Sequence, residues 1–337
     1  MAPSSGADGA DGAGATGRAP AASAEPSAAL PYLPRIRRYY QALGYGAPYV
    51  WARFGDVPFQ APRRPLSASR VAIVTTAAPY KADAGDQGPG APYNAGAKFY
   101  RVHSGATDTA PDLRISHVAI DRAHTRGDDL GSYFPLAALK RAAASGRILS
   151  VAPRFHGLPT NRSQRVSQDQ DAPEIVARCL ADDVHAVLLV ANCPVCHQSL
   201  AIAAHALEAA GLPTVLMGCA RDIVEHVGVP RLLFSDFPLG NAAGRPGDVA
   251  SQDQTLEMAL QLLVSATRPR STLASPLCWQ GAADWKRDYC NIDQLNSAQI
   301  ARLRSEFERA GDQARALRAA TPTGPASALS STLAKAG

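Results

Sequence analysis

Two cysteines three residues apart, Cys193 and Cys196, carry the clearest chemical signal in the chain, and His197 follows directly. The apolar residues 185–192 predict a buried strand, and Pro194 suits the first turn of a following helix. A thiol at a helix N-terminus faces unpaired N–H groups and the positive end of the helix dipole, which stabilise a thiolate. We therefore interpret Cys193 as a nucleophile, Cys196 as a resolving thiol, and His197 as a catalytic proton donor or acceptor.

Other uses of this cysteine pair stay open at this point. A zinc site needs two further ligands, and the sequence has no second C-x-x-C motif; the other cysteines are single, at Cys179, Cys219, Cys278 and Cys290. The C-x-x-C-H pattern also matches covalent haem attachment, but a position between a buried strand and a helix disfavours it. A pair of inert buried thiols is the remaining alternative.

Residues that follow other predicted strands are candidates for substrate binding, because ligands of parallel sheets bind beyond the carboxyl ends of the strands. Arg154 and Arg245 are candidate anchors for a substrate carboxylate. The full set of candidates is Thr75, Thr76, Arg154, His156, Asp236, Gly240 and Arg245. A purely structural loop, with Asp248 capping the next helix, is the alternative for the last three.

The elements that must position these residues alternate along the chain. Apolar runs predict strands at 70–78, 114–120, 148–155, 185–192, 213–218 and 231–237. Helices are predicted at 135–146, 172–181, 194–210, 221–227, 249–266 and 298–319. Residues 79–109 are predicted to form a long, functional loop. This order favours an α/β fold: a doubly wound, mostly parallel sheet with helices on both faces, in Rossmann or flavodoxin-like layers.

Five segments are expected along the chain. Residues 1–29 are rich in Ala, Gly and Pro and predict a disordered tail, and residues 30–69 combine arginines with aromatic residues. We expect the second segment to pack on the core rather than bind nucleic acid, because no RNA-binding motif accompanies it. An α/β domain at 70–270, a C-terminal helical extension at 271–320 and a frayed tail at 321–337 complete the chain.

Composition excludes several classes. The chain has 337 residues, of which 46% are hydrophobic, and a net charge of +5. No apolar run approaches the roughly 20 residues of a membrane span, so we expect no membrane partner. Six cysteines are too few for a disulfide scaffold, and the N-terminal segment lacks the pattern of a signal peptide. We therefore expect a cytoplasmic protein with reduced cysteines and no nucleic-acid partner. No G-x-G-x-x-G, Walker or G-x-S-x-G motif is present.

The order of several segments between residues 70 and 266 resembles a known family. These segments are TTAA, FPLAALKRAAASGRILSVAPR, HAVLLVANCPVCHQS, EAAGLPTV and FSDFPLGNAAGRPGD. Together they resemble the selenoprotein B family of glycine, sarcosine, betaine and D-proline reductases. The resemblance implies that a selenocysteine attacks the carbon bearing the amino group, that dithiols supply electrons, and that a separate pyruvoyl-containing subunit activates the amine. Here Cys193 stands at or near the selenium position, and the chain is a cysteine-containing relative without selenocysteine.

The resemblance and the residues together predict a thiol-dependent reductase that acts on a small amino-acid-like substrate. We expect no bound cofactor and no metal; an external dithiol or a thioredoxin system would donate the electrons. A thioredoxin-like donor or a reductase partner subunit is the expected partner, and a homo-oligomer is left open. Two alternatives remain: a non-catalytic subunit or binding protein of a reductase complex, and a cofactor-independent cysteine racemase. The absence of cysteine at residues 75–78 counts against the racemase.

Overall fold

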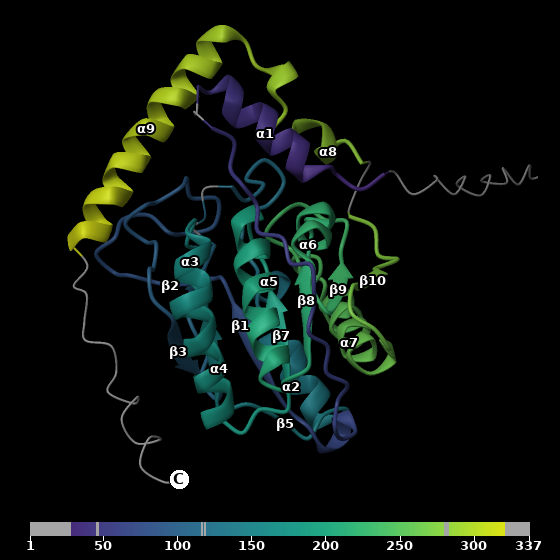
Figure 1. Cartoon of the computed structure of the whole chain (residues 1–337). Helices are drawn as coiled ribbons and strands as arrows, with labels where there is room; N and C mark the ends of the chain where they lie inside the picture. Colours follow the sequence, from purple (N-terminus) through teal and green to yellow (C-terminus); the bar gives the residue numbers. More distant parts are fainter. Residues whose placement is uncertain (1–27, 45–46, 116, 118, 280–282, 321–337) are drawn as a thin grey trace, which may run out of the picture.

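The computed structural model describes residues 28–44, 47–115, 117, 119–279 and 283–320, so the predicted tails lie outside it except for residues 28 and 29 (Figure 1). Its centre is an eight-stranded sheet in the order β10-β9-β8-β7-β1-β6-β3, with β5 also paired to β1. All pairings in this sheet are parallel except that of β3 with β6. The strands are β1 (Arg70–Thr75), β3 (His103–Ala106), β5 (Ser150–Val151), β6 (Arg154–Gly157), β7 (Ala186–Val190), β8 (Thr214–Gly218), β9 (Arg231–Phe234) and β10 (Ser271–Ala274).

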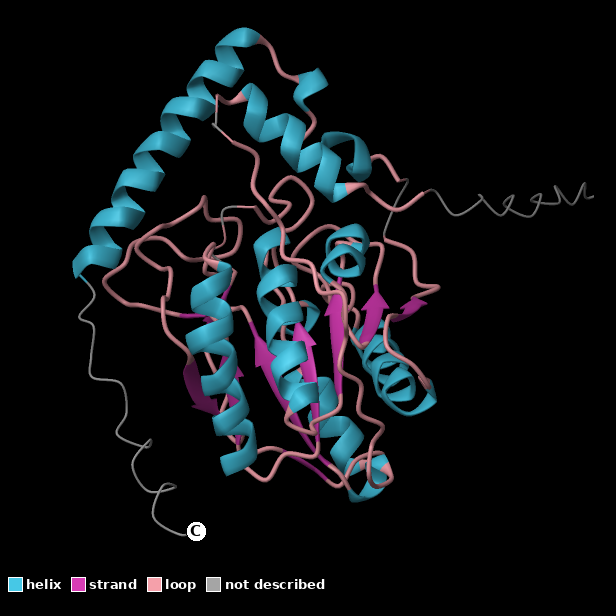
Figure 2. Cartoon of the chain, viewed as in Figure 1, coloured by secondary structure: helices cyan, strands magenta, loops and turns pink. Residues whose placement is uncertain are grey.

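Helices cover both faces of this sheet, as Figure 2 shows. Because side chains alternate along a strand, Ala72 and Val74 of β1 join one buried cluster, while Val71 and Ile73 join the other. The first cluster includes residues of α4 (Ala172–Ala181), α5 (Pro194–Ala209) and α6 (Arg221–Val227); the second includes residues of α2 (Leu136–Ala144) and α7 (Val249–Ser265). The predicted doubly wound α/β fold is confirmed.

The strand order reverses between β1 and β7. After β1 the chain adds β6 on one side of β1, and it then crosses to the other side for β7, β8, β9 and β10. At this switch point the loops diverge and leave a crevice, which is where ligands of such sheets bind. Thr76 follows β1, and its Oγ1 accepts hydrogen bonds from the backbone N–H and the Nδ2 of Asn192, which follows β7, at 3.3 and 3.2 Å. Cys193 is the next residue, so the cysteine pair lies at the switch point.

A cap of three helices lies over the carboxyl edge of the sheet (Figure 1). It consists of α1 (Tyr32–Ala42), α8 (Trp285–Asp288) and α9 (Ser297–Ala320). The rings of Tyr40 on α1 and Phe307 on α9 meet edge to face with their centroids 5.5 Å apart, and those of Tyr32 and Tyr289 do so at 5.3 Å. Segments from the two ends of the chain thus meet above the switch point.

The segment 48–60, which we call the strap, runs from the cap along the α5 face. The Ala52 N–H donates to Gln198 Oε1 at 2.7 Å, and the Phe54 N–H donates to the Val227 carbonyl at 3.0 Å. Phe54 also stacks on His205 of α5, with ring centroids 3.8 Å apart. Irregular backbone is stable here because side chains and carbonyls of the helices take up its hydrogen bonds.

The predicted strand at 114–120 is wrong. The described residues beyond Arg114 in this stretch are loop, and the short β4 (Leu113–Arg114) pairs with β2 (Ala78–Pro79) in a separate two-stranded sheet. Tertiary contacts override the local strand preference: the Ala119 carbonyl accepts from the Tyr289 hydroxyl at 2.9 Å, and Ile120 is buried. β3 lies inside the predicted loop 79–109, and the predicted strand at 148–155 is divided into β5 and β6.

The remaining helical elements are short. They are the 3-10 turns Leu66–Ala68, Leu130–Ser132 and Ile292–Gln294, the helix α3 (Gln164–Val166) and a π-helical turn at Ser167–Asp171. β10 adds residues 271–274 to the sheet, which the predicted domain at 70–270 leaves out. Within the described residues, no helix combines the length and the hydropathy of a membrane span.

Candidate functional site

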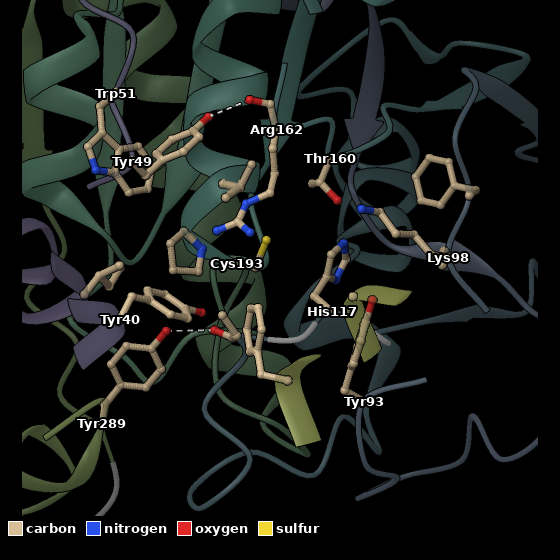
Figure 3. Close-up of a pocket in the computed structure, with 18 residues that line it drawn as sticks. Tyr40, Tyr49, Trp51, Tyr93, Lys98, His117, Thr160, Arg162, Cys193 and Tyr289 are labelled. Atoms are coloured by element: carbon tan, nitrogen blue, oxygen red, sulfur yellow. Dashed lines mark hydrogen bonds between the residues drawn. The ribbon is translucent and has the colours of Figure 1, made fainter. Parts of the chain in front are cut away.

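A cavity of about 190 Å³ lies between the switch point and the cap (Figure 3). Four parts of the chain enclose it: the cap, the strap, the N-terminus of α5 and the loops that follow β2, β4 and β6. The side chains that line it include Tyr40, Tyr49, Trp51, Tyr93, Lys98, Phe99, His117, Thr160, Arg162, Cys193, Pro194, Val195, Tyr289 and Phe307. This volume is below the roughly 300–1,000 Å³ typical of sites for drug-sized ligands, and a second cavity of about 380 Å³ shares Tyr40, Tyr49, Trp51 and Arg162 with it.

Cys193 lies at the floor of this cavity, and Cys196 lies behind it. Cys193 is the N-cap residue of α5, and its Sγ accepts a hydrogen bond from the Cys196 N–H at 3.3 Å. The structure joins the two residues in a disulfide, with Cα atoms 4.9 Å apart. Cys193 lines the cavity and is 5% exposed, whereas Cys196 is fully buried behind it. A molecule in the cavity therefore meets Cys193 first, and Cys196 is within bonding reach of the same sulfur.

His117, which is not among the predicted site residues, lies against the pair. The Sγ atoms of both cysteines and a ring nitrogen of His117 lie within 4.8 Å of one another. His117 Nδ1 is buried and has no hydrogen-bond partner among the described residues, whereas the ring does hydrogen-bond to the backbone of Thr76. Burial, with the nearby charges of Lys98 and Arg122, lowers the pKa of His117 to about 3, so the ring is neutral at physiological pH.

The charged groups at the cavity are cationic. Lys98 and Arg162 line it together with His117, and the described lining contains no Asp or Glu. Figure 3 shows the side chains of Arg162 and His117 on either side of Cys193. Arg162 also lies over the Tyr49 ring, 5.7 Å from its centroid. Fixed positive charge in a small, partly closed cavity favours an anionic ligand such as a carboxylate.

Aromatic side chains form another wall of the cavity. Tyr49 and Trp51 of the strap meet edge to face with centroids 4.9 Å apart. The Tyr49 hydroxyl donates to the Arg162 carbonyl at 3.2 Å and accepts from Gln198 Nε2 at 2.6 Å, so the strap is fastened both to α5 and to the loop after β6. This wall suits the apolar part of a small molecule whose charged end meets Lys98 or Arg162.

His197 has a different setting from the one its sequence position predicts. Its Nδ1 hydrogen-bonds to the Cys193 carbonyl at 2.7 Å, and its Nε2 accepts the N–H groups of Cys219 and Ala220 at 3.0 and 3.1 Å. The ring is fully buried and does not appear in the described lining of the cavity. Because both nitrogens bond to backbone, this placement does not fit a proton donor or acceptor for Cys193 Sγ. It fits a ring that fixes the start of α5 on the loop after β8.

Two predicted candidates at the end of β1 lie close to the cysteines. Thr76 holds Asn192, as described above, and Thr75 Oγ1 accepts from the Ala77 N–H at 3.0 Å. Both side chains are fully buried, and neither belongs to the described lining of the cavity. Their hydroxyls instead accept hydrogen bonds from Asn192 and from the Ala77 N–H, which fix the loops at the switch point.

The other candidates lie apart from the cysteine pair. Arg154 pairs with Asp182 at 2.6 Å, and His156 Nδ1 lies 2.8 Å from the Ser104 hydroxyl. Arg245 pairs with Asp248 at 2.7 Å and donates to the Cys278 carbonyl. Asp236 pairs with Lys286, and Gly240 adopts a φ of +111° beside Thr125. The structure does not bring these residues to the described cavity, and their roles in substrate binding stay predictions.

Sequence reasoning missed most of the cavity wall. Lys98 lies in a long Gly- and Pro-rich loop, His117 in a stretch that resembles a strand, and Arg162 seven residues after Phe155. The one sequence feature that could have predicted this wall is the high density of Tyr and Trp at 39–51. Such a density in an irregular segment is typical of binding surfaces as well as of packing.

Comparison with known proteins supports a relationship to a reductase subunit. A stretch of 154 residues is 29% identical to D-proline reductase subunit gamma of Acetoanaerobium sticklandii. The match covers 45% of this chain and 63% of that relative, so the chain spans less than two thirds of the relative's length. No family model and no solved structure matches the chain. The resemblance to reductase proteins is thus confirmed at this level, without assignment to the selenoprotein B family.

Proposed function

We propose that this chain is a thiol-dependent reductase in which Cys193 is the nucleophile and Cys196 the resolving thiol. One observation carries the proposal: Cys193 Sγ faces a small cationic cavity at the switch point, with Cys196 buried behind it at disulfide distance. The similarity to a D-proline reductase subunit supports this class of reaction. The N-terminus of α5 and the Cys196 N–H stabilise a Cys193 thiolate in the reduced protein.

The proposed substrate is a small amino acid or a closely related amine. Lys98 and Arg162 hold its carboxylate, and Tyr49, Trp51 and Tyr40 contact its apolar part. His117 has a ring nitrogen within 4.8 Å of the two sulfurs, and because burial keeps the ring neutral it hydrogen-bonds to Cys193 without taking up the thiol proton, which passes to solvent. His197 acts as a positioning residue, since it holds the Cys193 carbonyl and the α5 start in place.

The reaction balances as a two-electron reduction. The Cys193 thiolate attacks the carbon that bears the amino group, a C–S bond forms, and the C–N bond breaks as the amine leaves with its electron pair and a proton. The Cys196 thiolate then attacks Cys193 Sγ, the disulfide forms, and the carbon takes up a proton as the C–S bond breaks. An external dithiol or a thioredoxin-like protein reduces the disulfide. Activation of the amine is assigned to a partner subunit.

A non-catalytic subunit of a reductase complex is the second candidate. The observation in its favour is the name of the relative, which is one subunit of a reductase. In that case the cysteine pair would be structural, and its sulfurs would not react ahead of other thiols. The proposal and this candidate therefore differ in the reactivity of Cys193.

Differential alkylation of the reduced protein at mildly acidic pH tests the proposal. Cys278 is the reference because it is exposed, while burial raises the pKa of Cys179, Cys219 and Cys290 to about 12. Peptide mass spectrometry is expected to find Cys193 labelled ahead of Cys278 despite its low exposure, and a Cys193–Cys196 disulfide after mild oxidation. Labelling of Cys278 first, with no disulfide after oxidation, would favour the non-catalytic subunit.

A further inference from the structure

Three groups that bind soft metal ions meet at the switch point. Cys193 Sγ, Cys196 Sγ and a ring nitrogen of His117 lie within 4.8 Å of one another, and they come from two segments about 80 residues apart in sequence. Cys193 and Cys196 are buried, and His117 is half-buried. The sequence alone offered only the cysteine pair, so a third ligand is a feature of the fold.

The orientation of His117 is the second observation. Its ring hydrogen-bonds to the backbone of Thr76, while Nδ1 is buried and has no hydrogen-bond partner among the described residues. The buried Nδ1 is therefore left for another group. Histidines that bind metals typically donate the other ring N–H to a carbonyl or carboxylate, which fixes the tautomer and aims the lone pair. The ring of His197, by contrast, has both nitrogens hydrogen-bonded to backbone.

We propose that the reduced protein binds one zinc ion, or a similarly soft divalent cation, through Cys193, Cys196 and His117. In a tetrahedral site with Zn–S bonds of about 2.3 Å the ligand atoms lie about 3.8 Å apart, which small movements of these three groups reach once the disulfide is reduced. Binding releases the two thiol protons, and two thiolates balance the charge of the ion.

The fourth position of this ion faces the cavity. Cys193 and His117 both line the cavity, so the open side of the three ligands is the side on which a small molecule would lie. Lys98 and Arg162 at the same cavity favour an anion there, such as hydroxide or a carboxylate. Three protein ligands with one open position are typical of a catalytic rather than a structural zinc site.

Metal binding and dithiol chemistry exclude each other at this site. The ion needs both thiolates, and disulfide formation removes them. Oxidation of Cys193 and Cys196 is therefore expected to release the metal, and bound zinc is expected to protect Cys193 from alkylation. The cysteine pair and His117 would thus form a metal site that is controlled by the redox state of the cysteines. Metal binding at this site does not depend on reductase activity.

Cobalt and zinc titrations of the full chain, reduced with a phosphine and kept under nitrogen, test this inference. We expect one cobalt ion per chain with a thiolate-to-cobalt charge-transfer band, displacement of cobalt by zinc, and no binding after disulfide formation. Cys196→Ser is expected to remove the band, and His117→Gln to weaken binding by at least roughly tenfold. Cys278→Ser and His226→Gln are the matched controls and keep full binding.

Two results would overturn the inference. One is failure of the reduced wild-type protein to bind cobalt or zinc. The other is a thiolate band that persists in Cys196→Ser, or in the oxidised protein, because the metal would then be bound elsewhere. The comparison of reduced with oxidised wild type needs no variant, so a variant that fails to fold does not weaken the test. Rapid alkylation of Cys193 without metal binding would leave the reductase proposal standing alone.

Discussion

Gln198 Nε2 donates a hydrogen bond to the Tyr49 hydroxyl at 2.6 Å, so the helix that begins at the cysteine pair also holds the aromatic wall of the cavity. Gln198 Oε1 accepts the Ala52 N–H at 2.7 Å, and the amide is almost fully buried. One side chain therefore links the strap, the wall and the helix of Cys193. The position of the wall relative to the reactive sulfur depends on this link.

Gln198→Ala is expected to loosen the strap. The Ala52 N–H would lose its partner in a buried position, which costs about 1–3 kcal/mol of unfolding free energy. Urea unfolding measures the loss, and exposed Gln313→Ala on α9 is the control. Alkylation of Cys193 is also expected to accelerate, because the strap covers the cavity. A Gln198→Ala protein as stable and as slowly labelled as the wild type would show that the strap does not close the site.

His117→Phe is expected to slow the reaction of Cys193 with alkylating agents. The neutral ring lies beside the sulfurs, and loss of a hydrogen bond to a charged thiolate costs about 1.5–3 kcal/mol, which is roughly tenfold or more in the amount of thiolate. Cys278 in the same sample is the internal reference and keeps its rate. An unchanged ratio of Cys193 to Cys278 labelling would remove His117 from the proposed mechanism.

Breaking the buried ion pair of Arg231 and Glu208 is expected to destabilise the fold far more than breaking a surface pair. The two groups are fully buried and lie 2.9 Å apart, and Glu208 also accepts from the Thr214 N–H and hydroxyl. Glu208→Ala is expected to cost about 3–5 kcal/mol because it leaves a buried charge unpaired. Arg221→Ala, which breaks an exposed pair with Glu225, is expected to cost at most about 1 kcal/mol. Equal losses in the two variants would contradict this account.

Acidification is expected to destabilise the protein partly through His156. Burial lowers its pKa to about 4, although the Asp182 carboxylate opposes the shift. The unfolded chain takes up this proton near its ordinary pKa of about 6.5, whereas the folded protein does not. Protonation of His156 in the unfolded chain therefore costs no unfolding free energy above about pH 6.5, and it lowers the unfolding free energy progressively as the pH drops towards 4. His156→Asn should flatten the dependence of unfolding free energy on pH over this window, and an unchanged slope would assign the effect to other groups.

The sequence predicts the sheet and most helices because their signals are local. The apolar runs of β7 and β8 and the helices α4 and α6 follow from periodicity and from end residues alone. Residues 114–120 fail for the same reason: their apolar pattern suits a strand, but Tyr289 and the cap hold the Ala119 region as a loop. The strand preference of residues 114–120 cannot reveal the hydrogen bond between the Tyr289 hydroxyl and the Ala119 carbonyl, because the two residues are far apart in sequence.

The floor of the candidate site is predictable, and its walls are not. Cys193 and Cys196 are recognisable from their spacing and from the strand before them. The walls bring together residues as distant in sequence as Tyr40, Lys98, His117 and Phe307, and only the tertiary fold decides that they meet. Arg154 and Arg245 are plausible carboxylate anchors by type, but each has a close acidic partner that the sequence does not reveal.

The most direct test of the central claim is the reaction of the reduced protein with an aromatic disulfide whose released thiolate is coloured. The account predicts rapid release of one equivalent as Cys193 attacks, followed by a second as Cys196 closes the intramolecular disulfide. Cys196→Ser is expected to stop after the first and to retain a mixed disulfide at Cys193, and Cys193→Ser is expected to show neither rapid release. Rapid release that persists in Cys193→Ser, or a mixed disulfide found only at Cys278, would contradict the assignment of Cys193 as the reactive thiol.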